Sequence, residues 1–304
     1  MKSKNTSNII YIIGAGRSGT TLLDIALGNA TNIFNAGELN RFTKRNGIPH
    51  DARDEEVICF WKKVSDDLLQ QKFDEPKAYF SLSKKYEYHS AFLKLFIPYK
   101  NKTSFRIYSA YQKHLFEIIE ERVSENFDKG IIIDSSKYPM RGFFLSKIFQ
   151  DNISFIYVKR NPAAVVTSFQ KKDIEQPPKS RIAANLYLLI VNGLANIVVK
   201  MLGKTHKVSL VSYEDILQSP VATLTRIESE LNINLNNSKK LIEENEPLKV
   251  GLLFDGNRLR LEKEIIFRKD YVEMKPENLI DKVFHPLHKL IWHKQLKVNY
   301  NGDK

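Results

Sequence analysis

The sequence predicts an α/β fold in which helices flank a parallel β-sheet. Short runs rich in β-branched residues alternate with longer helical stretches, the pattern of consecutive βαβ units. The chain has 304 residues, of which 42% are hydrophobic, enough to bury one large core. No repeat or clear linker interrupts it, so we expect a single domain over residues 1–304.

The first half of the sheet is predicted from its apolar runs. IIYII at residues 9–13 predicts the first strand, and TTLLDIALGNA at 20–30 has the apolar spacing of the first helix. Ile33 and Phe34 predict a short second strand. Residues 40–128 are charged, aromatic-rich and helical in pattern, and we expect them to form an insertion that covers the edge of the sheet.

The second half repeats the alternation. Strands are predicted at 130–134 and 154–159, and helices at 138–149 and 180–201. Pro162 fits the first position of another helix, with Asn161 as its cap. HKVSLVSYEDI at 206–216 predicts a last strand that runs into a turn, followed by helices and an irregular stretch at 251–260.

Composition indicates the cellular compartment of the protein and the charge of its ligands. The single cysteine, Cys59, lies in ICFW and reads as a small core residue, which favours a reducing compartment. The apolar run near the N-terminus is too short for a signal peptide, and Asn192, Gly193 and Asn196 interrupt the longest later run, so we expect a cytoplasmic protein without a membrane span. The net charge of +12 favours anionic ligands without identifying one.

A glycine-rich turn follows the first strand. Gly14-Ala15-Gly16-Arg17-Ser18-Gly19-Thr20-Thr21 joins a strand to the N-terminus of a helix. Backbone N–H groups at such a junction lack helical partners and bind anions. The turn matches both G-x-G-x-x-G and a phosphate-binding loop without its lysine.

These two patterns leave two interpretations open. Glu38, about 20 residues beyond the turn, suits a dinucleotide site, where an acid holds a ribose hydroxyl. An ATP-type loop fits less well because Thr20 replaces the lysine that reaches the outer phosphates. Arg17 places a cation earlier in the loop, which suits a phosphosulfate, because a sulfuryl group carries less charge than a terminal phosphoryl group.

Five segments, in order, resemble the sulfotransferases that use 3′-phosphoadenosine 5′-phosphosulfate (PAPS). They are IIGAGRSGTTLL, FNAGEL, IIIDSSKYPMR, VKRNPAAVVTSF and VSYEDILQSP. The second and third are similar to segments of tyrosylprotein sulfotransferases and bacterial relatives. The resemblance implies a fold like that of the P-loop nucleoside triphosphate hydrolases, PAPS as the donor and no metal.

The resemblance also implies roles for individual residues. Glu38 would be the base that accepts the acceptor's hydroxyl proton, while Arg17 and Lys137 balance charge on the transferring sulfuryl group. The residues implied in donor binding are Gly16, Arg17, Ser18, Gly19, Thr20, Thr21, Arg160, Ser168, Tyr213 and Arg258. Ser135 and Ser136 either orient Lys137 or bind the donor.

Two positions depart from the family pattern. Asn161 stands where many relatives have aspartate, and the C-terminal cationic stretch of cytosolic sulfotransferases is absent in its usual form. GNRLR, with Arg258 and Arg260, resembles a Gly-Asn-x-x-Arg segment of some bacterial members. Either arginine is a candidate for contact with the donor.

Other functions remain open at this point. An NAD(P)-dependent oxidoreductase and a non-catalytic nucleotide- or polyanion-binding module are the alternatives. His285, His288 and His293 have no cysteine or carboxylate at metal-ligand spacing, so no metal site is predicted. His50 and His89, within the insertion, are weaker candidates for a base. The acceptor is left open among a small molecule, a glycan, a lipid and a peptide, with no nucleic-acid partner expected, and the sequence indicates no oligomeric state.

Overall fold

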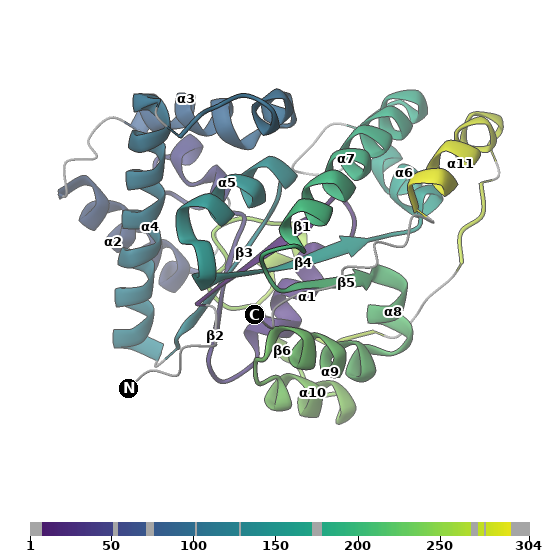
Figure 1. The fold of residues 1–304 in the computed structure, drawn as a ribbon. Helices are drawn as coiled ribbons and strands as arrows, with labels where there is room; N and C mark the ends of the chain where they lie inside the picture. Colours follow the sequence, from purple (N-terminus) through teal and green to yellow (C-terminus); the bar gives the residue numbers. More distant parts are fainter. Residues whose placement is uncertain are drawn as a thin grey trace.

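The fold is an α/β sandwich built on one five-stranded sheet, seen in a computed structural model (Figure 1). The structure describes residues 8–50, 54–70, 76–100, 102–127, 129–171, 178–268, 273–276 and 278–292. All five strands are parallel, in the order β2-β3-β1-β4-β5. They are β1 (Ile9–Gly14), β2 (Ile33–Gly37), β3 (Ile131–Lys137), β4 (Ile153–Lys159) and β5 (Val208–Ser212). The predicted fold class is confirmed.

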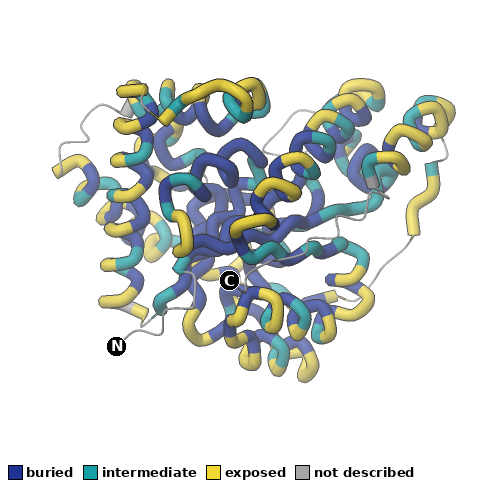
Figure 2. The backbone as a smooth tube through the Cα atoms, viewed as in Figure 1, coloured by how far each residue is buried: buried dark blue, intermediate teal, exposed yellow. Residues whose placement is uncertain are grey.

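Alternation along the strands divides the core into two layers. Tyr11 and Ile13 of β1 pack on one face, while Ile10 and Ile12 pack on the other, as side chains of a strand must. The first face is covered by α4 (Thr103–Phe127), α5 (Pro139–Phe149) and α7 (Arg181–Leu202). The second is covered by α1 (Thr20–Gly28), α8 (Tyr213–Gln218), α9 (Pro220–Leu231) and α10 (Asn236–Glu243). Figure 2 shows the sheet as the most deeply buried part of the molecule.

Helix α6 (Pro162–Gln170) follows β4 as the sequence predicts. Pro162 occupies the first turn, and the Asn161 side chain accepts hydrogen bonds from the amides of Ala163 and Ala164 at 2.9 and 3.4 Å. This cap fixes where the chain turns after β4, and therefore where Arg160 lies.

The described part of the insertion forms helices and the loops between them, with no strand. It contains η1 (Leu39–Arg41), η2 (Thr43–Arg45), α2 (Glu55–Gln70), α3 (Pro76–Glu87), η3 (His89–Leu95) and α4. Helix α2 packs on the edge strand β2, where the Phe60 ring lies 5.4 Å from Phe34. Trp61 Nε1 donates a hydrogen bond to the Leu252 carbonyl at 2.7 Å.

The prediction that Cys59 lies in the core is wrong. The buried face of α2 is formed by Phe60, Trp61, Val64 and Leu68, so Cys59 falls on the opposite side and is exposed. A helix turns by about 100° per residue, so two bulky neighbours do not bury a third position.

The C-terminal third departs from the prediction in two places. The last strand runs directly into α8, because Ser212 Oγ accepts a hydrogen bond from the Asp215 amide at 2.9 Å and caps a helix there. Strands β6 (Leu248–Lys249) and β7 (Glu264–Ile265) form a small antiparallel pair around the irregular stretch and η5 (Arg258–Leu261). Helix α11 (Leu279–Trp292) then packs on α7.

Among the described residues, one helix is long and apolar enough to cross a membrane by length and composition. It is α7, whose most apolar window has a mean hydropathy of 1.9 and is half buried within the molecule. Because α7 lies against the sheet and α5, it has the packing of a core helix.

Candidate functional site

The carboxyl ends of all five strands meet at one edge of the sheet. Ile13 pairs with Lys137 and Gly14 with Val158, so the glycine-rich loop, Lys137 and the residue after β4 emerge side by side. Gly37 pairs with Asp134 and Lys159 with Ser212. Ligands of open α/β sheets bind at this edge.

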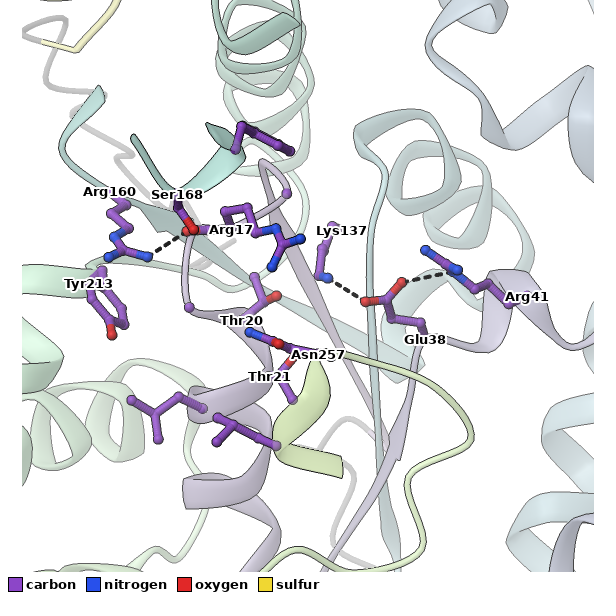
Figure 3. A pocket seen from close by; sticks show the side chains of 15 residues that line it. Arg17, Thr20, Thr21, Glu38, Arg41, Lys137, Arg160, Ser168, Tyr213 and Asn257 are labelled. Atoms are coloured by element: carbon purple, nitrogen blue, oxygen red, sulfur yellow. Dashed lines mark hydrogen bonds and ion pairs between the residues drawn. The ribbon is translucent and has the colours of Figure 1, made fainter. Parts of the chain in front are cut away.

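A pocket of about 130 Å³ opens there (Figure 3). Most of the predicted site residues line it: Gly16, Arg17, Gly19, Thr20, Thr21, Glu38, Lys137, Arg160, Ser168 and Tyr213. Leu22, Arg41, Phe169, Asn257 and Leu259 complete the lining. Four cations face one carboxylate in this lining, so the pocket favours an anionic ligand.

The glycine-rich loop combines two left-handed residues with the start of α1. Arg17 has φ of 67° and Gly19 has φ of 89°. A Cβ atom at Gly19 would overlap the Tyr213 ring, so only glycine fits there. The first amides of α1 have no intrahelical acceptor and lie beside the pocket.

Two polar groups of the glycine-rich loop form hydrogen bonds within the protein. Ser18 is buried, and its hydroxyl donates a hydrogen bond to the Ala15 carbonyl at 2.6 Å. Gly16 N–H donates to the Tyr187 hydroxyl of α7 at 3.0 Å. These contacts hold the shape of the loop, and they place the Ser18 hydroxyl away from the pocket lining.

Glu38 lies between two cations. Its carboxylate accepts a hydrogen bond from Lys137 Nζ, and Arg41 Nε lies 3.2 Å from the other oxygen. Burial by itself raises the pKa of Glu38, but Lys137 and Arg41 outweigh burial and lower the pKa below its usual range. Glu38 is therefore ionised at neutral pH.

A second carboxylate supports this cluster. Asp255 is buried and lies 2.9 Å from Arg45 Nη2 and 3.5 Å from Arg41 Nε. Its carbonyl accepts a hydrogen bond from the Glu38 amide at 3.1 Å. Arg41 is thus shared between two acids, and Asp255 fixes both the backbone and the counter-ion of Glu38.

Ser135 and Ser136 face the interior. Ser135 Oγ donates to Asp24 at 2.6 Å, while Ser136 Oγ donates to Asp134 and accepts from the Asn40 amide at 2.9 Å. Both serines are buried and neither lines the pocket. Of the two roles left open by the sequence, orientation of the end of β3 fits this geometry.

The Arg160 side chain contacts the glycine-rich loop and Tyr213. Its Nη1 donates to the Arg17 carbonyl at 2.8 Å, and its guanidinium carbon lies 4.2 Å from the centre of the Tyr213 ring. Its Nε is buried and has no hydrogen-bond partner within the described part of the chain. An unpaired buried donor of this kind suits an anionic ligand.

Several predicted residues lie outside the pocket. Arg258 is exposed and does not line it, although its neighbours Asn257 and Leu259 do. Arg260 Nη1 donates to the Gly256 carbonyl at 2.9 Å. His288 Nε2 lies 2.8 Å from Asn185 Oδ1, and burial lowers the pKa of this histidine to about 4. His293 lies outside the described residues.

His50 and His89, the weaker base candidates, lie outside the pocket. His89 stacks on Tyr138 at 5.1 Å, and burial lowers its pKa. The carbonyl of His50 accepts a hydrogen bond from Arg260 at 3.3 Å. Neither histidine lines the pocket. Across the ranges that the structure describes, no three His, Cys, Asp or Glu side chains are grouped as a metal site.

Arg41, Asp255 and Asn257 are the site residues that sequence reasoning missed. Asn257 contributes through its backbone, whose amide donates to Thr21 Oγ1 at 3.2 Å. Arg41 follows Glu38 by three residues in a short helical turn, so the i, i+3 spacing of opposite charges was a usable signal. No local charge spacing marked Asp255, because it lies more than 200 residues from Glu38 in the chain.

The sheet order argues against a dinucleotide-binding fold. Such folds place the second strand beside the first, in the order 3-2-1-4-5-6. Here β3 and β4 flank β1, and β2 is an edge strand. The Glu38 carboxylate also forms ion pairs with Lys137 and Arg41. In a dinucleotide site it would instead accept a hydrogen bond from a ribose hydroxyl.

Comparisons with known proteins bear on the fold and the family of this chain. The sulfotransferase domain from the curacin biosynthetic pathway superposes with a TM-score of 0.51 and 16% identity, covering 94% of this chain and 98% of its own. The sulfotransferase domain of the Synechococcus PCC 7002 olefin synthase has a TM-score of 0.44 and 17% identity, with 95% and 96% coverage. A search of curated sequences finds no match. The Sulfotransferase family profile matches residues 9–237, most of the chain, so the protein belongs to the sulfotransferase family.

Proposed function

We propose that this sulfotransferase moves the sulfuryl group of PAPS onto an acceptor hydroxyl. The observation that carries the proposal is the Glu38–Lys137 ion pair, placed beside a phosphate-binding loop that contains Arg17 in one pocket. The four pocket cations suit a donor with two anionic groups.

The donor would lie along the loop. The first amides of α1, with the hydroxyls of Thr20 and Thr21, would bind the 5′-phosphate. Arg160 has an unpaired buried Nε and, with Ser168, lines the other end of the pocket, which supports a role at the 3′-phosphate. Tyr213 supports both Gly19 and Arg160, so it would fix their separation. Arg258 stays a weaker donor candidate because it lies outside the pocket lining.

Transfer would proceed by in-line displacement. The acceptor oxygen forms a bond to sulfur while the bond from sulfur to the 5′-phosphate oxygen breaks, and Glu38 takes the hydroxyl proton. Arg17 and Lys137 balance the charge that develops on the sulfuryl oxygens and on the leaving phosphate. The products are a sulfate ester and 3′-phosphoadenosine 5′-phosphate.

The acceptor would enter from the insertion. Arg41, which belongs to the 40–128 segment, reaches the pocket and contacts Glu38, and this supports the insertion as the acceptor-binding region. Small-molecule, glycan, lipid and peptide hydroxyls all suit this chemistry. We also propose a cytoplasmic location, because the single cysteine, Cys59, is a free and exposed thiol, which suits a reducing compartment.

Thermal unfolding with ligands tests the proposal. We expect 3′-phosphoadenosine 5′-phosphate to raise the melting temperature, because a ligand that binds only the folded state stabilises it. Stabilisation by NADH alone would instead favour an oxidoreductase. Incubation with sulfur-labelled PAPS and an acceptor panel then separates an enzyme from a binding module, since only the enzyme forms labelled product.

Arg160→Lys sharpens the test of donor binding. Arginine can give a phosphate two parallel N–H donors, whereas lysine acts as a point charge. We expect affinity for 3′-phosphoadenosine 5′-phosphate to fall about tenfold in calorimetry. Lys159→Arg, at the last residue of β4 and outside the pocket lining, is the control. Unchanged affinity in Arg160→Lys would remove Arg160 from the donor site.

A further inference from the structure

Helix α7 exposes apolar side chains to solvent. From Ile182 to Val199 it has no charged residue. One side packs in the core, yet the other side presents Ile182, Leu186, Ile190 and Ile197, which are 47–61% exposed. A surface helix of a globular protein normally carries polar side chains there, and no described part of the chain covers this side.

Helix α11 exposes a second apolar stripe beside it. Leu279, Val283, Leu287 and Leu290 follow one another at helical spacing and are 50–76% exposed. The side of α11 that faces α7 is polar: Asp281 pairs with Arg181, and His288 bonds to Asn185. These polar contacts fix the rotation of α11, and they turn its apolar stripe outward.

The two stripes belong to neighbouring helices. We call the eight side chains, four on α7 and four on α11, the apolar face. Figure 2 shows exposed stretches along both helices, which lie next to each other at the upper right of the molecule. Segment η3 adds exposed Phe92 and Leu93, and its His89 packs on Tyr187 of α7 with ring centres 6.2 Å apart. A contiguous patch of exposed apolar side chains indicates an interaction surface.

The charges on these helices identify the kind of surface that would cover it. Lys200, Lys282 and Lys289 are exposed on α7 and α11. The helices contain one acid between them, Asp281, which is buried against Arg181. Lysines around an apolar face, without exposed carboxylates, are complementary to anionic lipid headgroups above an acyl layer.

We propose that the apolar face docks on an anionic membrane surface. The apolar side chains would enter the boundary between headgroups and acyl chains while the lysines contact phosphates. Helix α7 stays packed on the core, so the protein would lie on the membrane rather than cross it. Tyr187 of α7 bonds to the glycine-rich loop, so docking would bring the nucleotide pocket close to the membrane. This proposal does not depend on the proposed activity.

Vesicle sedimentation tests the docking. The 304-residue chain is mixed with vesicles of phosphatidylcholine alone, or with vesicles of one part phosphatidylglycerol to two parts phosphatidylcholine. We expect at least tenfold stronger partitioning to the anionic vesicles. Leu186→Gln with Ile190→Gln should lower that partitioning at least tenfold. Ile58→Gln with Leu69→Gln, at exposed apolar positions of α2 on another surface, is the control and should bind like the parent.

A lysine-to-glutamate variant, melting curves and light scattering separate membrane docking from unfolding and from dimer formation. Lys282→Glu with Lys289→Glu should also weaken binding to anionic vesicles. Melting curves of all variants should match the parent, because every substituted side chain is exposed. Three outcomes would overturn the proposal: equal binding by the parent and the Leu186/Ile190 variant, no binding by the parent, or a dimer in light scattering that the same variant dissociates.

Discussion

Two non-glycine residues of the pocket adopt left-handed backbone conformations. Arg17 has φ of 67° and Lys137 has φ of 74°. This region is costly for side chains with a Cβ atom, and such residues gather at functional sites when the surrounding structure holds them in place. Here the hydrogen bond from Arg160 to the Arg17 carbonyl and the buried serines before Lys137 provide that support.

Glu38 is held as an anion before any substrate arrives. Lys137 and Arg41 lower its pKa, which makes it a poor proton acceptor in this state. A bound sulfuryl group would compete for Lys137. If Lys137 turned to a bound donor, Glu38 would lose one cation and its pKa would rise. We expect the base to become effective only when the donor is present.

Replacing Glu38 tests its role as the base. Glu38→Gln keeps the size of the side chain but cannot accept the proton. We expect turnover to fall by roughly a hundredfold or more, with affinity for the desulfated donor retained. Labelled product formation and calorimetry measure the two effects. Glu56→Gln, an exposed acid of α2, should keep full turnover; normal turnover in Glu38→Gln would exclude Glu38 as the base.

Asp24, beneath the loop, makes stability depend on pH. Burial raises the pKa of Asp24 to about 8, which the hydrogen bond from Ser135 only partly opposes. The folded state therefore keeps a proton that the unfolded state releases near pH 4. The stabilisation is complete below that pH and is lost as the pH rises toward 8.

Asp24→Asn should remove this dependence. We expect the parent's unfolding free energy to fall more steeply than the variant's between pH 5 and pH 8, by up to about 1.4 kcal/mol per pH unit. Urea unfolding at several pH values measures the slopes. Parallel slopes would show that Asp24 titrates as it does in the unfolded chain.

At the scale of elements, one buried arginine joins the site to the insertion. Arg141 of α5 is fully buried and pairs with Asp134 of β3 at 2.8 Å and with Glu87 of α3. Asp134 in turn accepts from Ser136, just before Lys137. The position of Lys137 therefore depends on how α3 and α5 pack.

Removing Arg141 should be costly. Arg141→Met would leave two carboxylates buried without their cation, and breaking a buried ion pair costs about 3–5 kcal/mol. Chemical denaturation should show that loss, while Arg106→Met, at an exposed position of α4, should stay close to the parent. A loss below about 1 kcal/mol would mean that the cluster rearranges without Arg141.

Elements with strong local signals were predicted well. The strands of the sheet, α1, α6 and α7 carry clear apolar periodicity or a proline with its cap, and the structure has them within a few residues of the predicted bounds. β6 and β7 have only two residues each and pair across more than ten residues, so no local pattern marks them. The buried side of α11 is polar, which hid its packing on α7.

At the scale of the whole molecule, the net charge of +12 and the four pocket cations should make donor binding depend on salt. We expect affinity for 3′-phosphoadenosine 5′-phosphate to fall severalfold between about 50 mM and 500 mM sodium chloride, because screening shortens the reach of these charges. Calorimetry at both concentrations measures this. Uncharged adenosine is the control, and an equal loss for both ligands would argue against an electrostatic cause.

The sequence by itself determined the α/β class, the glycine-rich loop and the family, because these depend on local periodicity and on short motifs whose residues are neighbours in the chain. It also predicted Glu38, Lys137 and Arg160 as site residues; each lies at or just after the end of a strand, and all three line the pocket. Only the tertiary structure decided that β3 lies between β2 and β1, that Asp255 supports Glu38, that Cys59 is exposed, and that Arg258 lies outside the pocket. Those facts depend on contacts between residues far apart in the chain, and on which side of a helix faces the core.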